Sequence, residues 1–581
     1  MRALGSRAVF ISLLGLTPVG LQAQELNELR SHLAGIFGTG GWQGASWGVA
    51  VVSLDEGDTL FAVEPDAPRS PASNLKLLTT AAALQVLGPE YRFRTYLLTD
   101  GEIEGGVVRG NLILYGTGDP GISDRFFHSR EAVFNRLIDE LDALGVHTVA
   151  GHVVGDASFL PGPLRPEGWD ARDLNDHFSA AVSALSFNEN VLSFRVVPAA
   201  PGEPPAVHTV PDYPGLAVVN EARTVAAGVR PRVHILRDDP LDSVRVEGRI
   251  LSGARDVWRQ MTVSVPAHFA AAAFKAELER RGITVAGGVR VVDHPGESVL
   301  GPVAAPALGA RRARVLARHV SDPLLAYLQV VNKESNNLYA ELVFRALGRA
   351  AEGVGSPEAG ARAVRRELEA LGVDMSGVTQ LDGSGLSAGN RVSAATFVSV
   401  LQRMASGPNW QAYWATLPEA GRRGGLSRMY RTAAAGNLRA KTGTIEGVSA
   451  LTGMVRSADG ERIAFSLLVN GTRSTSRAKT AENEVGAVLA SFRRPAISAP
   501  AVSFVEAVQP LPSPSAIEVM RRDAWTGDGS RHRVASGESL WVIAGQYGIS
   551  VDELVRANPL IEPNRILAGQ WIDIPRRGGG E

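Results

Sequence analysis

Cysteine is absent from this chain of 581 residues, which excludes disulfide bonds, thiolate metal sites and cysteine nucleophiles. The eleven histidines form no cluster with the spacing of metal ligands, so we expect neither a metal nor another cofactor. Lysine is also scarce, because it supplies only 5 of the 59 basic residues and arginine supplies the other 54. A lysine that persists in such a chain is a candidate for a role that arginine cannot fill.

Long apolar runs are missing too. The apolar stretch over residues 8–20 has 13 residues, which is too short to cross a bilayer. It follows a short basic segment, residues 1–7, and precedes a small residue, Ala23. This pattern predicts a secretory signal over residues 1–23 and secretion across the cytoplasmic membrane to the periplasm or cell wall. An uncleaved anchor and a buried helix are the alternatives; after cleavage we expect no membrane span.

The chain also lacks a strong charge of either sign. Its net charge of −1 gives no basis for binding nucleic acid or an anionic membrane surface. A hydrophobic content of 45% with 20% charged residues is typical of a soluble globular protein. The length exceeds what one hydrophobic core supports, so we expect about three to four domains.

Two hairpins and a set of helices indicate one α/β domain. Alternating residues predict a hairpin of 47–53 with 59–63 and another of 448–456 with 462–470. A run of strong helix formers starts at Ser73 and is apolar on most sides, which predicts a central, buried helix. Further helical patterns lie between this run and the second hairpin.

The pattern changes to short strands and turns between residues 91 and 311. We therefore predict a β-rich insertion at 91–311 that splits the α/β domain into residues 24–90 and 312–493. Prolines then stud residues 494–530, which predicts a linker. A compact module follows over residues 531–576, so the whole chain is expected to be multidomain.

Two of the rare lysines stand in short motifs. The first motif, SNLK over residues 73–76, places Ser73 and Lys76 on one face of a helix start. A serine hydroxyl becomes a good nucleophile only when a neighbouring base takes its proton. A lysine can be that base once burial or a nearby cation lowers its pKa. The plain alternative is a capping serine at an ordinary helix start.

Two further motifs follow downstream. The SNN stretch at 335–337 lies within a helical pattern, where polar residues on their own would more often face solvent or end at a loop. The KTGT stretch at 441–444 precedes a strand, and Gly443 would let a substrate backbone approach closely. Lys441 is also the cation that would lower the pKa of Lys76.

The order Ser-x-x-Lys, Ser-x-Asn, Lys-Thr-Gly resembles that of active-site serine penicillin-binding proteins and serine β-lactamases. Over about residues 25–493 the chain resembles the class C low-molecular-mass penicillin-binding proteins, which are D-alanyl-D-alanine carboxypeptidases and endopeptidases. The 262 residues between Ser73 and Ser335 fit the insertion that this family carries there and exceed the spacing of a serine β-lactamase. Further matching stretches are PASNLK (71–76), GNLILYGTGDP (110–120), GDASFL (155–160), SALSFNENV (183–191), DGSGLS (382–387) and KTGTIEGVSALTG (441–453).

This resemblance implies an α/β transpeptidase fold of the penicillin-binding-protein and β-lactamase type with a large β-rich insertion. It implies that Ser73 is acylated, that Lys76 is its base, and that Ser335 relays a proton to the leaving group. Asn337 would donate a hydrogen bond to the substrate amide. The substrate would lie along the strand that begins near Lys441 as an extra strand.

The resemblance also implies binding roles. Lys441 and Thr442 would meet a terminal carboxylate of the substrate, next to Gly443. The backbone N–H groups of Ser73 and Thr444 would form the oxyanion hole. Asp156 resembles an acidic residue of the insertion that faces the substrate's amine.

One position departs from the family pattern. The family often has arginine directly after the DGSGLS stretch, whereas this chain has Ala388 there and Arg391 nearby. Binding of a side-chain carboxylate of the peptide is therefore expected to differ.

The C-terminal module resembles a LysM domain, a small α+β module that binds glycans containing N-acetylglucosamine. It reads as strand, helix, helix, strand, and an unrelated small helical cap is the alternative. The residues that match the glycan-binding loop and the end of the second helix are Gly537, Glu538, Ser539, Leu540 and Asn558.

Together these features predict a penicillin-sensitive serine D-alanyl-D-alanine carboxypeptidase, D,D-endopeptidase, or both. Its expected partners are peptidoglycan stem peptides and glycan strands, with β-lactams as inhibitors and no nucleic acid. Two alternatives remain open: a serine β-lactamase or esterase on the same fold, and a catalytically inert peptidoglycan-binding protein.

Overall fold

The computed structural model describes most of the chain. The described residues are 18–38, 42–213, 216–226, 232–239, 243–301, 313–422, 424–494, 531–534 and 571–574, with Ile543, Tyr547, Leu554 and Asn558. The chain divides into two compact units, Met1–Gly121 with Phe134–Ser498, and Ile122–Val133 with Ala499–Glu581.

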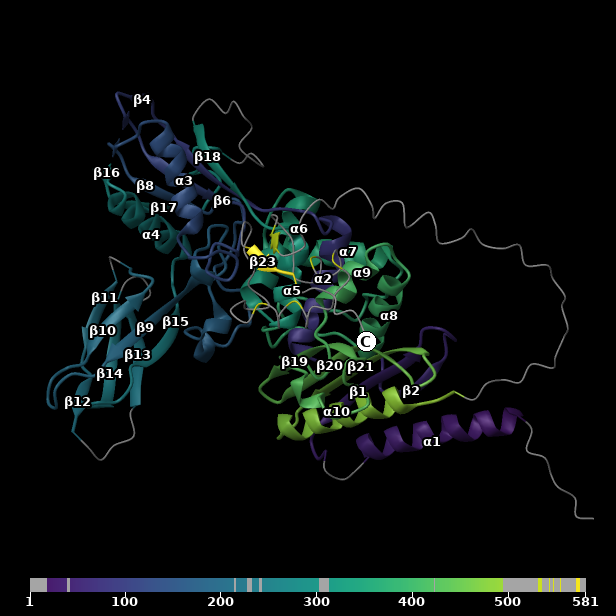
Figure 1. The fold of residues 1–581 in the computed structure, drawn as a ribbon. Coiled ribbons are helices and arrows are strands. Elements are labelled where there is room, and N and C mark those ends of the chain that lie inside the picture. Colours follow the sequence, from purple (N-terminus) through teal and green to yellow (C-terminus); the bar gives the residue numbers. More distant parts are fainter. Residues whose placement is uncertain are drawn as a thin grey trace, which may run out of the picture. The chain divides into compact units, whose positions relative to one another are not determined.

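The first unit contains an antiparallel five-stranded sheet in the order β19-β20-β21-β1-β2 (Figure 1). Its strands are β1 (Ser46–Ser53), β2 (Thr59–Val63), β19 (Arg439–Ile445), β20 (Val448–Arg456) and β21 (Arg462–Asn470). Both predicted hairpins are present. β1 also pairs along its whole length with β21, so segments from the two ends of the domain share one sheet.

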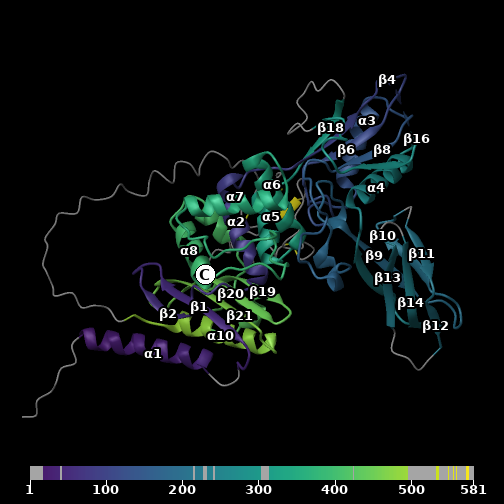
Figure 2. The ribbon, with the colours of Figure 1, turned by 180° about the vertical axis from the view of Figure 1, so that it is seen from behind.

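Helices cover both faces of this sheet. One face carries two helices that lie side by side, and α8 packs against the other (Figures 1 and 2). Alternate side chains of β1, Trp47 and Val49 among them, join Leu33 and Val485 in the core between the sheet and the helix pair. The helices are α1 (Pro18–Gly38), α10 (Thr475–Ser491) and α8 (Ala394–Ala405).

One helix forms the centre of the helical half of the domain. α2 (Lys76–Val86) contacts all the other helices of this half, and residues 76–84 are buried, as the sequence pattern predicts. The short 3₁₀ helix η1 (Ala72–Leu75) leads directly into it. The neighbours are α5 (Leu324–Lys333), α6 (Asn337–Glu352), α7 (Pro357–Ala370), α8 and α9 (Trp410–Thr416).

α1 as a whole is not predicted from the sequence. This helix begins at Pro18 and continues past Ala23, where we predict signal cleavage, so cleavage there would leave the part that carries Leu29 and Leu33. Both leucines are buried in the core of the domain. No helix within the described residues is both long enough and apolar enough to cross a membrane.

The region predicted as a β-rich insertion contains four sheets. A mixed sheet in the order β17-β8-β6-β3-β18 lies beside a smaller one in the order β16-β7-β5-β4, and α4 packs on both. The elements of the larger sheet are β3 (Arg94–Thr99), β6 (Leu112–Gly116), β8 (Val153–Asp156), β17 (Val289–Val292) and β18 (Arg314–Val320). The others are β4 (Ile103–Glu104), β5 (Val107–Val108), β7 (Thr148–Val149), β16 (Thr284–Val285), α3 (Ala132–Ala143) and α4 (Pro266–Arg280).

The other two sheets of the insertion form a sandwich (Figure 2). One sheet has the order β10-β9-β15. In the second sheet β14 is the central strand and pairs with β11, β12 and β13. Val196 of the first sheet and Val246 of the second are fully buried in the core between them. The strands are β9 (Val191–Val197), β10 (Ala206–Val210), β11 (Ala217–Asn220), β12 (Arg223–Val225), β13 (Arg232–Asp239), β14 (Ser243–Leu251) and β15 (Val257–Thr262).

One strand lies beyond the predicted end of the insertion. β18 begins at Arg314, on the peptidase side of the boundary predicted at residue 312, yet it pairs with β3 of the insertion. The strand then runs into α5, so the chain leaves the insertion nearer residue 321. The polar alternation of β18 gives no sign of which sheet it joins.

In the second unit, the two strands predicted at the ends of the C-terminal module are present. β22 (Arg531–Arg533) pairs antiparallel with β23 (Trp571–Asp573). Asn558 fixes this arrangement, because its side chain donates to the carbonyls of Leu554 and Asp573 and accepts from the Asp573 N–H.

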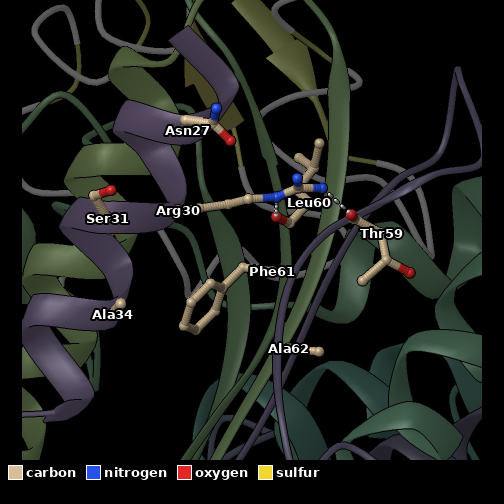
Figure 3. Close-up of a pocket in the computed structure, with 8 residues that line it drawn as sticks. All are labelled: Asn27, Arg30, Ser31, Ala34, Thr59, Leu60, Phe61 and Ala62. Atoms are coloured by element: carbon tan, nitrogen blue, oxygen red, sulfur yellow. Dashed lines mark hydrogen bonds between the residues drawn. The ribbon is translucent and has the colours of Figure 1, made fainter. Parts of the chain in front are cut away.

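A hollow of about 550 Å³ lies between α1 and β2 (Figure 3). Arg30 of α1 reaches across it and donates hydrogen bonds to the backbone carbonyls of Leu60 (2.9 Å) and Thr59 (3.2 Å). β2 is an edge strand, and unpaired carbonyls on such an edge invite pairing with another chain. Arg30 therefore stabilises the edge of the sheet.

We predict that α1 is an integral part of the catalytic unit. Leu33→Ala removes a side chain with no solvent exposure and should lower the free energy of unfolding by about 2–5 kcal/mol. Urea unfolding followed by circular dichroism measures the change. His32→Ala is the control, because the His32 side chain is 56% exposed and should cost less than about 0.5 kcal/mol. Equal stability of wild type and Leu33→Ala would contradict this role of α1.

Candidate active site

Ser73 sits on η1 immediately before the central helix. Its neighbour Ala72 has a left-handed backbone (φ +44°), which is costly for a residue with a side chain. Ser73 is not a capping serine, since the residues that precede η1 and α2, Pro71 and Leu75, make no side-chain cap. The hydroxyl instead lies 2.9 Å from the Lys76 amine.

The Lys76 amine is fully buried and has three oxygen partners. It lies 2.9 Å from the Ser73 hydroxyl, 2.6 Å from Asn337 Oδ1 and 2.7 Å from the Ser384 carbonyl. The last two oxygens can only accept hydrogen bonds. A neutral amine has two N–H groups to give them, so its lone pair is left for the Ser73 O–H. This geometry suits a base that takes the serine proton.

The orientation of the Asn337 amide is fixed from the insertion. Its Nδ2 donates to the backbone carbonyl of Phe178 at 2.8 Å. A carbonyl can only accept, so Nδ2 must face Phe178 and Oδ1 must face Lys76. A loop of the insertion therefore helps to hold the candidate base, a contact that sequence reasoning did not find.

The SNN motif lies at a break between two helices. The sequence pattern predicts a helical run through it, but α5 ends at Lys333 and α6 begins at Asn337. Ser335 has a left-handed backbone (φ +59°), and the Asn336 side chain caps α6 by accepting from the Tyr339 N–H. The break turns the Ser335 hydroxyl toward the KTG strand.

Lys441 on β19 completes the cluster. Its amine is fully buried, lies 2.9 Å from the Ser335 hydroxyl, and donates to the Thr442 carbonyl at 2.7 Å. The structure therefore brings together the five residues predicted as catalytic: Ser73, Lys76, Ser335, Asn337 and Lys441. They come from three segments that are far apart in the sequence.

Gly443 permits a close approach of another backbone, but that backbone belongs to η1 and not, as we expect, to the substrate. A Cβ there would lie 2.8 Å from the Pro71 carbonyl and 3.1 Å from the Ser73 nitrogen. The strand thus passes against η1, so the glycine is needed for contact within the chain itself. Thr442 and Thr444 lie on the same strand with partly or fully exposed side chains. β19 is an edge strand. Its start is bridged to Glu419, whereas beyond Ala440 no described strand pairs with its outer edge.

The DGSGLS loop (382–387) supplies the carbonyl that holds Lys76, and two buried carboxylates hold the loop. Glu341 of α6 accepts hydrogen bonds from the backbone N–H groups of Gly383 and Ser384 at 2.8–3.0 Å. Sequence reasoning matched this loop to the family but gave it no role. The glycines of this loop and its aspartate, which bonds back to the loop backbone, are the sequence signal that could have indicated this role.

Asp382 is the second carboxylate and closes the loop on itself. It accepts from the N–H groups of Gly385 (2.8 Å) and Ser387 (2.6 Å). The indole of Trp169 in the insertion donates to it at 3.0 Å. Trp169 and Phe178 thus give the insertion two hydrogen bonds to the parts that position Lys76.

Burial makes the neutral form of Lys76 accessible near neutral pH. Burial lowers the pKa of Lys76 to about 7, although the charges of Asp382 and Glu341 act in the opposite direction. Burial, reinforced by the positive charge of Lys76, holds the pKa of Lys441 well below its usual value. Burial and the nearby Asp382 raise the pKa of Glu341 to about 7.

Asp156 does not reach this cluster, which corrects the expectation that it faces a substrate amine. It ends β8 inside the insertion and is 1% exposed. Its carboxylate accepts from the Ser158 N–H at 3.0 Å and from the Ser298 hydroxyl at 2.6 Å. Burial raises its pKa, so the group is a structural acceptor that is closed to solvent.

The remaining predicted residues lie elsewhere. Arg391 donates to the carbonyl of Ala388 at 2.7 Å, so its guanidinium is bound near the end of the DGSGLS loop. Among the expected glycan contacts, residues 537–540 lie outside the described residues. Asn558 is buried, and its amide bonds within the module, which favours a structural role for it. In the described part of the chain, no group of three or more His, Asp or Glu side chains is placed to hold a metal ion.

Comparison with known proteins agrees with this geometry. Residues 29–492 match the family described as D-Ala-D-Ala carboxypeptidase 3 (S13), and residues 532–575 match the LysM domain. The chain is 36% identical over 481 residues to "D-alanyl-D-alanine carboxypeptidase" of an Actinomadura species, a match that covers 79% of this chain and 85% of that protein. It is 28% identical over 408 residues to "D-alanyl-D-alanine carboxypeptidase DacB" of Haemophilus influenzae, which covers 69% of this chain and 80% of that protein.

The fold is also that of a solved relative. The crystal structure of penicillin binding protein 4 (dacB) from Haemophilus influenzae superposes with a TM-score of 0.67 at 25% identity, over 80% of this chain and 99% of that one. The predicted fold class is therefore confirmed. With a family match over most of its length and a fold shared with a solved relative, the chain belongs to the S13 family of D-Ala-D-Ala carboxypeptidases and carries a C-terminal LysM domain.

Proposed function

We propose that this protein is a serine D-alanyl-D-alanine carboxypeptidase that acts on the stem peptides of peptidoglycan. The observation that carries the proposal is the Lys76 amine, whose lone pair is directed to the Ser73 hydroxyl by two acceptor-only partners. The relatives named above are D-alanyl-D-alanine carboxypeptidases, and they match most of this chain.

In the first step Lys76 takes the hydroxyl proton as Ser73 attacks the carbonyl carbon of the penultimate D-alanine. Negative charge develops on the carbonyl oxygen, and the N–H groups of Ser73 and Thr444 would stabilise it. Each such donor contributes about 3–4 kcal/mol in comparable enzymes. The Ser335 hydroxyl, 2.9 Å from Lys441, then passes a proton to the leaving nitrogen and takes one in return from protonated Lys76, so D-alanine departs and Lys76 is neutral again. Water releases the remaining peptide from the Ser73 ester with Lys76 again as base.

We propose that the substrate peptide binds along the free edge of β19. A substrate in extended form would pair with this edge as an additional strand. Its terminal carboxylate would then lie near Lys441 and Thr442. Because the pKa of Lys441 is held low by burial and by Lys76, the arriving carboxylate favours its protonation. Lys441 would thus be charged chiefly in the complex with substrate.

Two other functions have less support. A serine β-lactamase needs the same nucleophile, but neither the large insertion nor a glycan-binding module serves the hydrolysis of a small antibiotic. An inert wall-binding protein would not keep the nucleophile, base and proton relay within hydrogen-bond distance. The LysM match supports binding to the glycan of peptidoglycan and, with the apolar N-terminal segment, a location in the periplasm or cell wall.

Ser73→Ala should abolish release of D-alanine from a soluble D-Ala-D-Ala peptide and labelling by a fluorescent penicillin, because both need the same hydroxyl. Wild-type protein should be labelled stably, with the adduct on Ser73 in mass spectrometry of its peptides. Ser476→Ala on the exposed side of α10 is the matched control and should keep both activities. An adduct on another serine would refute the assignment, and rapid turnover of the penicillin would favour the β-lactamase.

The rate of acylation by penicillin should rise with pH, because only the neutral amine of Lys76 accepts the serine proton. With a pKa of about 7, the rate should fall about tenfold per unit below pH 6 and level off above pH 8. Glu341→Gln removes a negative charge that favours the ammonium form, so the midpoint should move to lower pH. Stopped-flow acylation at each pH measures both effects.

The control for this experiment is Glu369→Gln, which changes an exposed carboxylate on α7 and should leave the profile in place. A midpoint that stays fixed in Glu341→Gln would contradict the electrostatic link between Glu341 and Lys76. A profile that falls between pH 6 and pH 8 in the wild type would contradict Lys76 as the base.

Truncation after residue 500 should leave hydrolysis of a small soluble peptide nearly unchanged, because the C-terminal module supplies none of the catalytic residues. The same truncation should weaken binding to intact peptidoglycan and slow D-alanine release from it, since tethering raises the local concentration of stem peptides. Both substrates are compared at matched enzyme concentration. Loss of activity on the small peptide would show that the module is part of the catalytic fold. Unchanged binding to intact peptidoglycan would contradict its role as an anchor.

A further inference from the structure

The sandwich of the insertion has one outward sheet face with an unusual composition. Trp258 on β15 is 52% exposed, more than most large apolar side chains of the described residues. It stands directly opposite Arg195 of β9, and Arg195 stands opposite His208 of β10. The three side chains therefore form one row across the whole sheet.

Strand alternation shows that this row faces away from the sandwich core. Val196, Val207 and Val257 are the next residues along the three strands, and they pack in the core. Side chains alternate between faces along a strand, so Trp258, Arg195 and His208 share the other face. All three are exposed there.

The polar neighbours of Trp258 on this face are suited to hydroxyl and amide groups. Gln260 stands two residues along β15, and its side-chain amide donates a long hydrogen bond to the Ser193 hydroxyl at 3.5 Å. Arg195 is paired with Asp256 at 2.5 Å, which fixes its guanidinium beside the indole and offsets its charge. Within the described residues, neither the Trp258 indole nor His208 has a side-chain hydrogen bond.

The face is continuous with the loop that borders the catalytic residues. Thr262, at the end of β15, donates from its hydroxyl to the Leu174 carbonyl at 3.0 Å. The same loop continues to Phe178, whose carbonyl holds Asn337. From Thr262 to Trp258 the strand covers about 13 Å, so β15 links the row to this loop.

We propose that this outward face of the β10-β9-β15 sheet binds the glycan strand of peptidoglycan, with Trp258 stacking on a sugar ring. A pyranose has an apolar face of C–H groups that packs on an indole, while its hydroxyl and N-acetyl groups bond to polar side chains. A nearly neutral face with one indole, one paired arginine, a glutamine and a histidine fits an uncharged amino sugar. The proposal rests on the proposed function, because it extends the contact of the same polymer beyond the active site.

A protein partner is the other occupant to consider. Protein interfaces of this kind centre on a cluster of apolar side chains. Here Trp258 is the single large apolar side chain among the described residues of its row. The only apolar residues of the next row along β9 and β10 are the smaller Val197 and Ala206. The composition therefore favours a sugar.

Hydroxyl-radical footprinting of the full-length protein tests the contact directly. Peptide-free glycan strands are added, and oxidation of each tryptophan is measured by mass spectrometry, with a free tryptophan dipeptide as the dose standard. Trp258 should lose most of its oxidation when glycan is present. This readout separates Trp258 from the tryptophans of the LysM module and does not require catalysis. Unchanged oxidation of Trp258 would overturn the proposal in favour of a protein partner.

Kinetics of Trp258→Ala give a second test. The variant should keep its kcat/KM on a soluble D-Ala-D-Ala peptide and lose about fivefold on stem peptides still attached to glycan strands, through KM. Leu236→Ala, which removes a 39% exposed side chain from the other sheet, should change neither value. Equal loss on both substrates would make Trp258 structural and overturn the proposal. A wild type inactive on the soluble peptide would refute the carboxypeptidase, while the footprint would still decide the glycan contact.

Discussion

The amine of Lys76 is the constraint on which the rest of the catalytic unit depends. A buried amine without partners would be costly, whereas this one is surrounded by three oxygens, two of which cannot donate. The two acceptors fix both N–H groups and leave the lone pair for Ser73. Reactivity therefore follows from the satisfaction of ordinary hydrogen bonds around a fully buried amine, together with the fall in pKa that burial causes.

The two oxygens that accept from Lys76 are each held by further hydrogen bonds, and these bonds join distant parts of the chain. Asn337 is oriented by a carbonyl of the insertion, and the Ser384 carbonyl sits on a loop that Glu341 and Asp382 fix from two sides. Trp169 ties the insertion to that loop. The insertion is therefore part of the catalytic frame, which explains why a domain of this size can interrupt the α/β unit without separating its two halves.

Sequence alone predicted the fold class, the two hairpins and the three motifs, because short motifs and alternating strands are local signals. It did not predict α1, whose first turns overlap the apolar segment interpreted as a signal. It also took the helix through Ser335 as continuous, because a left-handed residue leaves no mark in hydrophobic periodicity. Asp156 was misplaced because a resemblance in one short stretch cannot tell a buried acceptor from an exposed one. The roles of Trp169, Phe178 and Glu341 depend on contacts between distant segments and had no local signal.

The pairing of β1 with β21 determines when the active site can assemble during synthesis of the chain. Asn470 at the end of β21 bonds to Ser70, three residues before the nucleophile, across 400 residues of chain. At a synthesis rate of about 5–20 residues per second, roughly 20 to 80 seconds separate the appearance of these two segments. During that interval the first strand has no sheet to join, and the nucleophile has no KTG strand beside it. Hydrolytic activity can therefore arise only after the Ser70 and Asn470 segments have met.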